Sequence, residues 1–280
     1  MPLKVLLCAL LSCDSGATNV LSNFGSATTA PGANKVRKNL LFESTFEEAS
    51  SLDKWYGQDK ASTRSIMRTD SAARDGKYAA RFEINKTDVM VAGGKRAELT
   101  LEHEKKLNIR RWYGMSIYLP ASYSVSPEPE IVAQWHVKPD DKLGEDWRSP
   151  PIALLTKNGR WWLAINWAKA PVNSNETIDG WKNIDLGPYN RGAWSDWVFE
   201  INFSWKKDGL INVWQNDTLL YSYTGPNAYN DKTGPFLKVG LYKWEWQSEK
   251  LKRYLYYDEV RVGDDAATYY DVRPGNSSKL

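Results

Sequence analysis

Cysteine and histidine are the residues that this chain of 280 amino acids most nearly lacks. Its two cysteines, Cys8 and Cys13, both lie within the first 13 residues, so no internal disulfide can hold the rest of the sequence together. No His/Cys cluster has the spacing of a zinc site. Of the two histidines, His136 lies in the strand-like segment Gln134-Trp-His136. It is our first candidate for a base that acts near neutral pH.

An excess of charge of one sign and long apolar runs are also missing. The 37 basic and 34 acidic residues leave a net charge of only +3, which predicts no nucleic acid partner and no attraction to a membrane surface. No apolar run approaches the roughly 20 residues that span a bilayer. The apolar share of 42% is nevertheless sufficient for a sizeable core.

The first residues have the features of an export signal. Residues 1–13 carry one positive charge before a short apolar run, as a secretory leader does. Leu10-Leu-Ser-Cys13 also resembles a bacterial lipoprotein cleavage box, in which Cys13 would be lipidated; a plain signal peptide is the alternative. Residues 14–38 are rich in Ser, Ala, Thr, Gly and Asn and predict a disordered linker. We therefore expect a secreted, periplasmic or cell-surface protein.

Aromatic residues are abundant, with 14 Trp and 15 Tyr. They favour strands, and they also line sugar-binding clefts, so both interpretations stay open. Short apolar or alternating runs, separated by turns such as Lys157-Asn-Gly159, predict strands within a domain over residues 39–270, followed by a tail over 271–280. These runs are 39–46, 78–84, 96–102, 111–119, 130–137, 152–156, 161–167, 197–204, 210–215, 218–223, 236–244 and 253–262. So many strands without a linker predict an all-β, two-sheet β-sandwich of the jelly-roll, concanavalin A-like type. We expect residues 168–193 to form a loop.

Three of these strands place polar groups on one face and apolar groups on the other. The polar positions are Arg96 and Glu98, then Gln134 and His136, then Lys238, Gly240 and Tyr242. A solvated sheet face would normally carry Thr, Ser, Lys and Glu instead. Gly240, between Lys238 and Tyr242, would leave room for a ligand to approach the backbone. The three strands together predict a functional surface.

This set of groups suits β-elimination from a uronic acid. The reaction removes the C5 proton, α to a carboxylate, and expels the 4-linked sugar oxygen. Arg96 and Gln134 could bind the carboxylate and stabilise its developing charge. Neutral His136 can accept a proton. Tyr242 could protonate the leaving oxygen, or act as the base if nearby Lys238 and Arg96 lower its pKa.

Two other functions remain as alternatives. A glycoside hydrolase on such a sheet would carry paired carboxylates, as in Glu-x-Asp-x-x-Glu, and the sequence has no such motif. A non-catalytic, lectin-like module would bind glycans through its aromatics but would have no reason to keep both His136 and Tyr242. An acidic polysaccharide is therefore the expected partner.

The three segments resemble those of the jelly-roll polysaccharide lyases. Alginate lyases carry Arg-x-Glu-Leu, Gln-x-His and Lys-x-Gly-x-Tyr strands, which match Arg96-Ala-Glu-Leu99, Gln134-Trp-His136 and Lys238-Val-Gly-Leu-Tyr242. The heparin lyase I-like and glucuronan lyase group is similar over more of the chain, roughly residues 40 to 265. It shares the late strand Tyr256-Tyr-Asp-Glu-Val-Arg261.

The resemblance implies a carboxylate-neutralising role for Arg96 and Gln134, acid–base roles for His136 and Tyr242, and substrate contact by Lys238. We expect Glu98 to contact the substrate as well. It implies no cofactor for the chemistry, and we expect a monomer. Thr100 and the pair Lys243-Trp244 depart from the alginate lyase pattern, so alginate is not the default substrate.

Some residues are secondary candidates. Members of this fold often hold a structural calcium between the first and last strands, where Glu43 and Asp258 could supply oxygen ligands. For substrate contacts the candidates are Trp162 and Asn166, which share one face of their strand, and the loop aromatics Trp181 and Tyr189.

Overall fold

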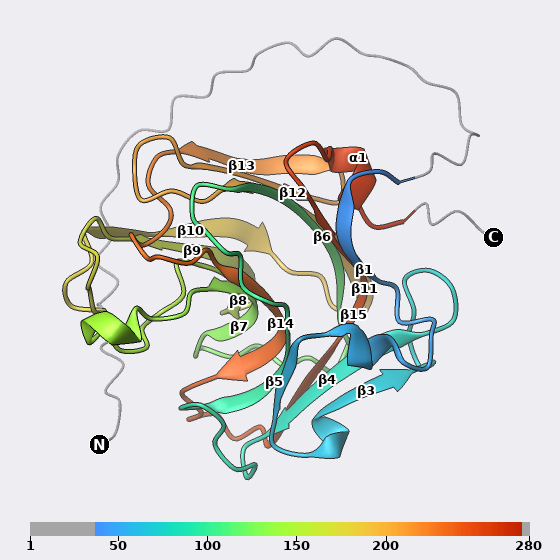
Figure 1. Cartoon of the computed structure of the whole chain (residues 1–280). Helices are drawn as coiled ribbons and strands as arrows, with labels where there is room; N and C mark the ends of the chain where they lie inside the picture. The colour runs from blue at the N-terminus through green and yellow to red at the C-terminus, as the bar shows by residue number, and fades with distance from the viewer. Residues whose placement is uncertain (1–36, 276–280) are drawn as a thin grey trace. The chain divides into compact units, whose positions relative to one another are not determined.

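A computed structural model describes residues 37–275 (Figure 1). The predicted leader over residues 1–13, with Cys13, lies outside the described residues, as does nearly all of the predicted linker. In the part that is described, two antiparallel sheets form a β-sandwich, which confirms the predicted fold class. None of the helices within residues 37–275 is long and apolar enough to cross a membrane.

The first sheet contains eight strands in the order β13-β12-β11-β6-β15-β4-β3, and β1 pairs with the end of β15. Its strands are β1 (Leu40–Ser44), β3 (Ile66–Thr69), β4 (Ala79–Asn85), β6 (Arg110–Leu119), β11 (Ala193–Asn202), β12 (Leu210–Gln215), β13 (Thr218–Thr224) and β15 (Lys252–Gly263). β15 pairs with β4 over its first half and with β1 over its second half. We call this sheet A.

The second sheet, sheet B, contains seven strands in the order β10-β9-β8-β7-β14-β5-β2. Its strands are β2 (Gly57–Lys60), β5 (Lys95–Thr100), β7 (Glu130–His136), β8 (Ile152–Lys157), β9 (Arg160–Trp167), β10 (Gly180–Pro188) and β14 (Phe236–Lys243). The three strands with predicted polar faces, β5, β14 and β7, are immediate neighbours, and β5 lies next to the edge strand β2.

The core lies between the two sheets and consists of the alternate, apolar residues of each strand. Large aromatics fill it: Trp135 of sheet B meets Phe199 of sheet A at 4.7 Å between ring centroids, and Trp161 meets Trp197 at 5.2 Å. All four side chains are completely buried. Since Trp135 faces the core, its neighbours Gln134 and His136 point to the other face of sheet B, as the alternation predicts.

Three strands and one boundary differ from the sequence-based expectations. The segment 168–193 is not entirely a loop, because Gly180–Pro188 forms the edge strand β10. The edge strands β2 and β3 were not predicted either. The short helix α1 (Tyr269–Val272) extends the fold beyond residue 270, since Val272 is fully buried against Trp112 and Val198. Three other short helical turns, η1 (Ser51–Lys54), η2 (Thr63–Ser65) and η3 (Asp141–Leu143), lie in connecting segments.

Candidate active site

The outer face of sheet B collects the polar residues of β5, β14 and β7. In the strand register Tyr242 lies opposite Arg96, Lys238 opposite Gln134, and Phe236 opposite His136. The predicted groups from segments about 40 and 100 residues apart therefore form one continuous polar surface. Paired strands lie about 4.8 Å apart, which brings their side chains within hydrogen-bonding reach.

Glu98 is the centre of this surface. It is 1% exposed, and one carboxylate oxygen accepts from Arg96 Nη1 at 2.7 Å and lies 2.9 Å from Lys238 Nζ. Its other oxygen accepts from the Gln134 amide. Burial alone would raise the pKa of the carboxyl, but Lys238 and Arg96 outweigh it and hold the pKa below its ordinary value. Glu98 therefore remains ionised and holds Arg96, Lys238 and Gln134 in position, and at 1% exposure it does not reach the surface in this structure.

Arg96 is fixed by the loop that precedes its strand. Its Nε donates to the Val91 carbonyl at 3.0 Å and its Nη2 to the Ala92 carbonyl at 3.1 Å. Its guanidinium lies 3.5 Å from the centre of the Tyr242 ring. With one hydrogen each of Nη1 and Nη2 still unused by these bonds, Arg96 keeps donors for a substrate carboxylate.

Tyr242 is half-buried, and burial raises the pKa of its phenol above the ordinary value although Arg96 opposes the rise. In the free protein the phenol is therefore protonated at neutral pH. The idea that Lys238 and Arg96 lower this pKa enough for Tyr242 to be a ready base does not hold in this structure.

Gln134 is fully buried, and its Nε2 donates to Glu98. Its Oε1 has no hydrogen-bond partner within residues 37–275. An unpaired buried amide oxygen is unfavourable, and such groups concentrate at functional sites. In this structure Gln134 positions Glu98, and a direct contact with a substrate carboxylate requires the covering side chains to move.

His136 lies among aromatic rings and is neutral. It stacks on Phe236 with centroids 5.7 Å apart, and Trp147 packs edge-on at 5.3 Å. Burial, with the nearby charges of Lys238 and Arg96, lowers its pKa to about 4. Its Nδ1 lies 2.9 Å from the Val137 carbonyl and 2.8 Å from the Val137 amide nitrogen. The tautomer that donates from Nδ1 to the carbonyl leaves Nε2 free to accept a proton.

A bulge separates His136 from Tyr242 along the sheet. His136 is opposite the start of β14 and Tyr242 is six residues further along that strand, with a register shift against β7 between Val239 and Tyr242. Gly240, in this bulge, has φ +138°, and a Cβ there would lie 2.1 Å from the Ala97 carbonyl oxygen. The glycine thus allows the backbone of β14 to approach the Ala97 carbonyl of β5 closely. The expectation that it makes room for a ligand is wrong.

The other predicted contacts divide between the outer face of sheet B and the core. Trp161, Leu163 and Ile165 are buried, which places Trp162 and Asn166 on the same outer face as Gln134. Trp181, 46% exposed on β10, lies opposite Asn166 on that face.

Tyr189, in contrast, is a core residue. It is only 9% exposed and packs against Trp161 and Tyr123 with centroids about 6 Å apart, so it cannot close over a sugar.

Lys238 is 6% exposed and has a partner that the sequence analysis missed. Its Nζ lies 2.6 Å from Asp59 Oδ2 on β2, directly opposite Glu98. Asp59 belongs to a wholly polar four-residue edge strand, which has no apolar alternation to reveal it. Trp147 was also missed. It is 56% exposed in the connecting loop after β7, and nothing in its local pattern marks it.

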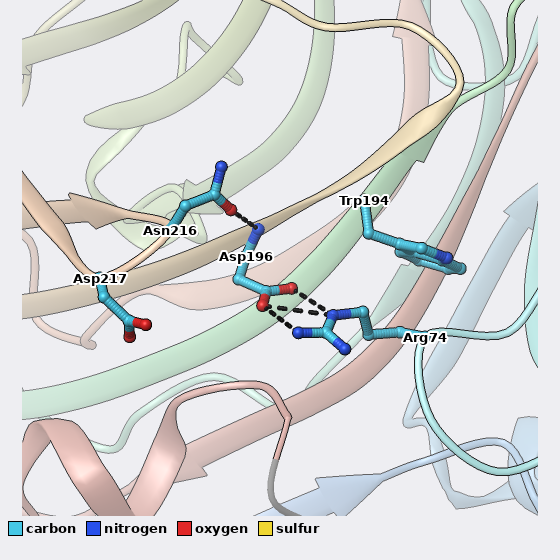
Figure 2. Close-up of a pocket in the computed structure, with 5 residues that line it drawn as sticks. All are labelled: Arg74, Trp194, Asp196, Asn216 and Asp217. Atoms are coloured by element: carbon cyan, nitrogen blue, oxygen red, sulfur yellow. Dashed lines mark hydrogen bonds and ion pairs between the residues drawn. The ribbon is translucent and has the colours of Figure 1, made fainter.

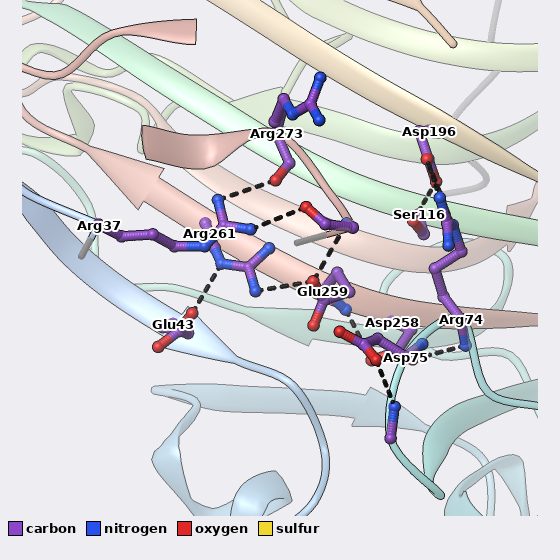
Figure 3. A network of polar contacts seen from close by, with 12 residues as sticks. Arg37, Glu43, Arg74, Asp75, Ser116, Asp196, Asp258, Glu259, Arg261 and Arg273 are labelled. Carbon is purple, nitrogen blue, oxygen red and sulfur yellow. Dashed lines mark hydrogen bonds and ion pairs between the residues drawn. The ribbon is translucent and has the colours of Figure 1, made fainter. Parts of the chain in front are cut away.

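The two carboxylates proposed for calcium already have protein partners (Figure 3). Glu43 accepts from Arg261 Nε at 2.7 Å. Asp258 accepts from the backbone amides of Arg74, Asp75 and Glu259. Within residues 37–275 no three acidic, His or Cys groups gather as metal ligands. These contacts do not fit a calcium site built on Glu43 and Asp258.

Comparison with known proteins settles the family. The model of the family described as polysaccharide lyase matches residues 47–261, which is more than half of the chain. The chain belongs to the polysaccharide lyase family. This lyase has no significant match among curated protein sequences.

Solved structures show the same fold at low sequence identity. An endo-β-1,4-glucuronan lyase from the fungus Trichoderma reesei superposes with a TM-score of 0.71 and 18% identity, over 85% of this chain and 100% of that one. A product complex of the alginate lyase A1-II′ gives 0.51 and 14%, over 72% and 84%. The alginate lyase Aly36B gives 0.50 and 11%, over 84% and 97%.

Proposed function

We propose that this lyase cleaves a uronate-containing polysaccharide by β-elimination and leaves an unsaturated uronate at the new non-reducing end. The observation that carries the proposal is the Glu98-centred cluster, which positions two cations between a neutral His136 and a protonated Tyr242. Neither acid–base group needs to change its charge before the reaction begins.

The donors that remain on Arg96 and Lys238 would receive the uronate carboxylate. Lys238 uses two contacts, to Asp59 and Glu98, which leaves one N–H, and Arg96 has two. These charged donors stabilise the negative charge that moves onto the carboxylate when the C5 proton leaves. Glu98 and Asp59 balance the positive charges of Arg96 and Lys238, so this cluster has little net charge in the free protein. The substrate carboxylate would bring one further negative charge.

The proton transfers follow from the charge states of the free protein. His136 Nε2 takes the C5 proton, the C4–O bond breaks as the C4–C5 double bond forms, and the Tyr242 phenol gives its proton to the departing sugar oxygen. The imidazolium and phenolate that result exchange a proton with solvent before the next turnover. The opposite assignment, with Tyr242 as base, needs a bound substrate to lower its pKa first.

Glucuronan is the first substrate to test for two reasons. The glucuronan lyase structure superposes with a TM-score of 0.71, against 0.51 and 0.50 for the two alginate lyases. Thr100 and Lys243-Trp244 also set the sequence apart from the alginate lyase pattern. We also propose that the protein is exported, on the leader-like composition of residues 1–13 and the extracellular location of its polymeric substrates.

The test is to incubate the protein with glucuronan, alginate and hyaluronan and to follow the ultraviolet absorbance of the unsaturated product. His136→Ala and Tyr242→Phe should each lower the rate about a hundredfold or more. New reducing ends without absorbance would identify a hydrolase, and binding without either would identify a lectin-like protein. Near-wild-type rates in both variants would exclude the assigned roles.

A further inference from the structure

A polar pocket lies on the outer face of sheet A, the sheet that does not carry the proposed catalytic residues. It measures about 430 Å³ and is lined by Arg74, Trp194, Asp196, Asn216 and Asp217 (Figure 2). Trp194 and Asp196 belong to β11, on the face opposite the buried Trp197 and Phe199. The size is within the range of small-ligand sites.

Ion pairs and hydrogen bonds fix the side chains and the turn that line the pocket. Arg74 makes a two-pronged ion pair with Asp196, at 3.0 Å from Nε and 2.7 Å from Nη2. The β12–β13 turn has φ +48° at Asn216 and +65° at Asp217, the left-handed values of a tight hairpin turn. Tyr269 and Arg273 hold that turn by donating to Asp217 Oδ1 at 2.6 and 3.0 Å.

Asp258 on β15 fixes the loop that carries Arg74. Asp258 accepts from the backbone amides of Arg74 and Asp75 at 2.8 and 3.2 Å (Figure 3). Asp196 also accepts from Ser116, on the neighbouring strand β6. The lining groups are thus preorganised, which lowers the entropy lost when a ligand binds.

Both donors and acceptors remain unused in this pocket. Within residues 37–275, Asn216 uses its Oδ1 to accept from the Asp196 amide, and no bond involves its Nδ2. Arg74 Nη1 and Asp217 Oδ2 are likewise without a bond in this part of the chain. A hydroxyl group donates and accepts at once, so a ligand rich in hydroxyls can satisfy both kinds of group.

An aromatic surface continues from the pocket across sheet A. Trp194 is partly exposed and lies 5.4 Å from Tyr118, which lies 5.8 Å from Tyr256, and the three stand opposite one another on β11, β6 and β15. Such cross-strand aromatic pairs stabilise sheets in their own right. Here, however, the row ends at a pocket of free polar groups, an arrangement that suits the apolar face and hydroxyl edge of a pyranose.

We infer that this pocket is a non-catalytic saccharide-binding site that holds a pyranose unit of a polysaccharide chain through Trp194 and the polar groups around it. Arg74 is balanced by Asp196, and Arg273 by Asp217, so the site recognises hydroxyls rather than a carboxylate. Its role is to keep the enzyme on polymer while the opposite face of the sandwich performs the reaction. The choice of glucuronan as one probe rests on the proposed function; the recognition of hydroxyls does not.

Affinity electrophoresis tests the site without relying on turnover. Native gels would contain hydroxyethyl cellulose, which is uncharged, or glucuronan, with all glucuronan lanes in a His136→Ala background so that the polymer stays intact. Trp194→Ala should weaken retardation roughly tenfold in apparent affinity, and Trp194→Phe, which keeps a ring beside Tyr118, should weaken it less. None of these changes alters the charge of the protein, so mobilities in polymer-free gels are directly comparable.

The matched control is Leu219→Ala, which removes a 52% exposed apolar side chain from β13 beside the pocket. It should leave retardation unchanged. Thermal unfolding and lyase activity on short oligosaccharides should be the same in wild type, Trp194→Phe and Leu219→Ala. Equal retardation of the wild type and both Trp194 variants in both polymers would overturn the inference. If the wild-type protein shows Trp194-dependent retardation but no lyase activity on any polymer, the result contradicts the proposed function and not this inference.

Discussion

At the level of single residues, His136 illustrates how surroundings set chemistry. Its contacts with Phe236 and Trp147, with two cations nearby, keep the imidazole neutral. Because its pKa is lowered to about 4, the acid limb of kcat/KM on the polymer substrate should fall near pH 4 rather than near the 6.5 of a free histidine. Initial rates at low substrate concentration between pH 3 and 8 measure it. A limb near 6.5 would show that His136 is not the group that must be deprotonated.

A second residue, Asp59, would compete with substrate for Lys238 in the proposed mechanism. Its carboxylate is 2.6 Å from Nζ and its side chain is 38% exposed, so the pair is partly screened by solvent. Asp59→Asn should free one lysine N–H for the substrate carboxylate and lower KM roughly threefold to tenfold, with a steeper dependence on salt.

The control for this substitution is Asp185→Asn. Asp185 is also an acid on the outer face of sheet B, but it pairs with Arg160 at the far edge of the sheet and should leave KM unchanged. A higher KM in Asp59→Asn would mean instead that Asp59 positions Lys238.

At the level of elements, the loop between β7 and β8 brings Trp147 to His136. Arg148, almost fully buried, anchors this loop through Glu145 at 3.0 Å and Asp231 at 2.5 Å. Trp147→Ala should raise KM severalfold because it removes an exposed ring beside the reacting groups. It should also move the acid limb of kcat/KM upward, since His136 becomes more exposed to water.

Both effects are measurable from the same pH series on glucuronan oligosaccharides. Tyr56→Ala, which removes a 71% exposed aromatic outside the Glu98-centred cluster, serves as the comparison. If Trp147→Ala changes neither KM nor the pH profile, the loop has no part in substrate binding.

The strands that sequence patterns identified are those that bury one face. β7 and β14 alternate because Trp135 and Leu237 must enter the core, and the same alternation places Gln134 and Lys238 on the outer face of sheet B, where other side chains cover them. The missed strands are edges: β2, whose four residues are Gly-Gln-Asp-Lys, has no buried side chain to create a pattern. Asp59 and Trp147 were unpredictable for the same reason, since each reaches the site through tertiary pairing alone.

At the level of the whole molecule, two buried carboxyls make stability depend on pH. Burial raises the pKa of Asp231 and of Asp258 to about 7. In the unfolded chain they ionise near pH 4, so between about pH 4 and 7 the unfolded state loses protons first, and the free energy of unfolding falls as pH rises. His136 makes the free energy of unfolding rise with pH between about pH 4 and 6.5, because its pKa is lower in the folded state. The two aspartates together outweigh this single group.

Asp258→Asn isolates one of these contributions. We measure the free energy of unfolding of this variant and of the wild type by denaturant titration. The difference, variant minus wild type, should increase as pH rises from 4 to 7, because only the wild type loses the contribution of Asp258. The exposed Asp53→Asn should show no such trend. A constant difference across this range would mean that Asp258 ionises normally in the folded protein.

The contact between Arg37 and the end of the fold has a consequence for how the chain could be rearranged. Arg37 donates to the carbonyls of Asp271, Arg273 and Gly275, so the first and last described residues touch. A few glycines could join Gly275 to Arg37, and new ends could open at the Lys157-Asn-Gly159 hairpin turn. Such a circular permutant would keep every strand pairing and would lose only the covalent connection through one turn. The order in which the strands are encoded is thus separable from the architecture that they build.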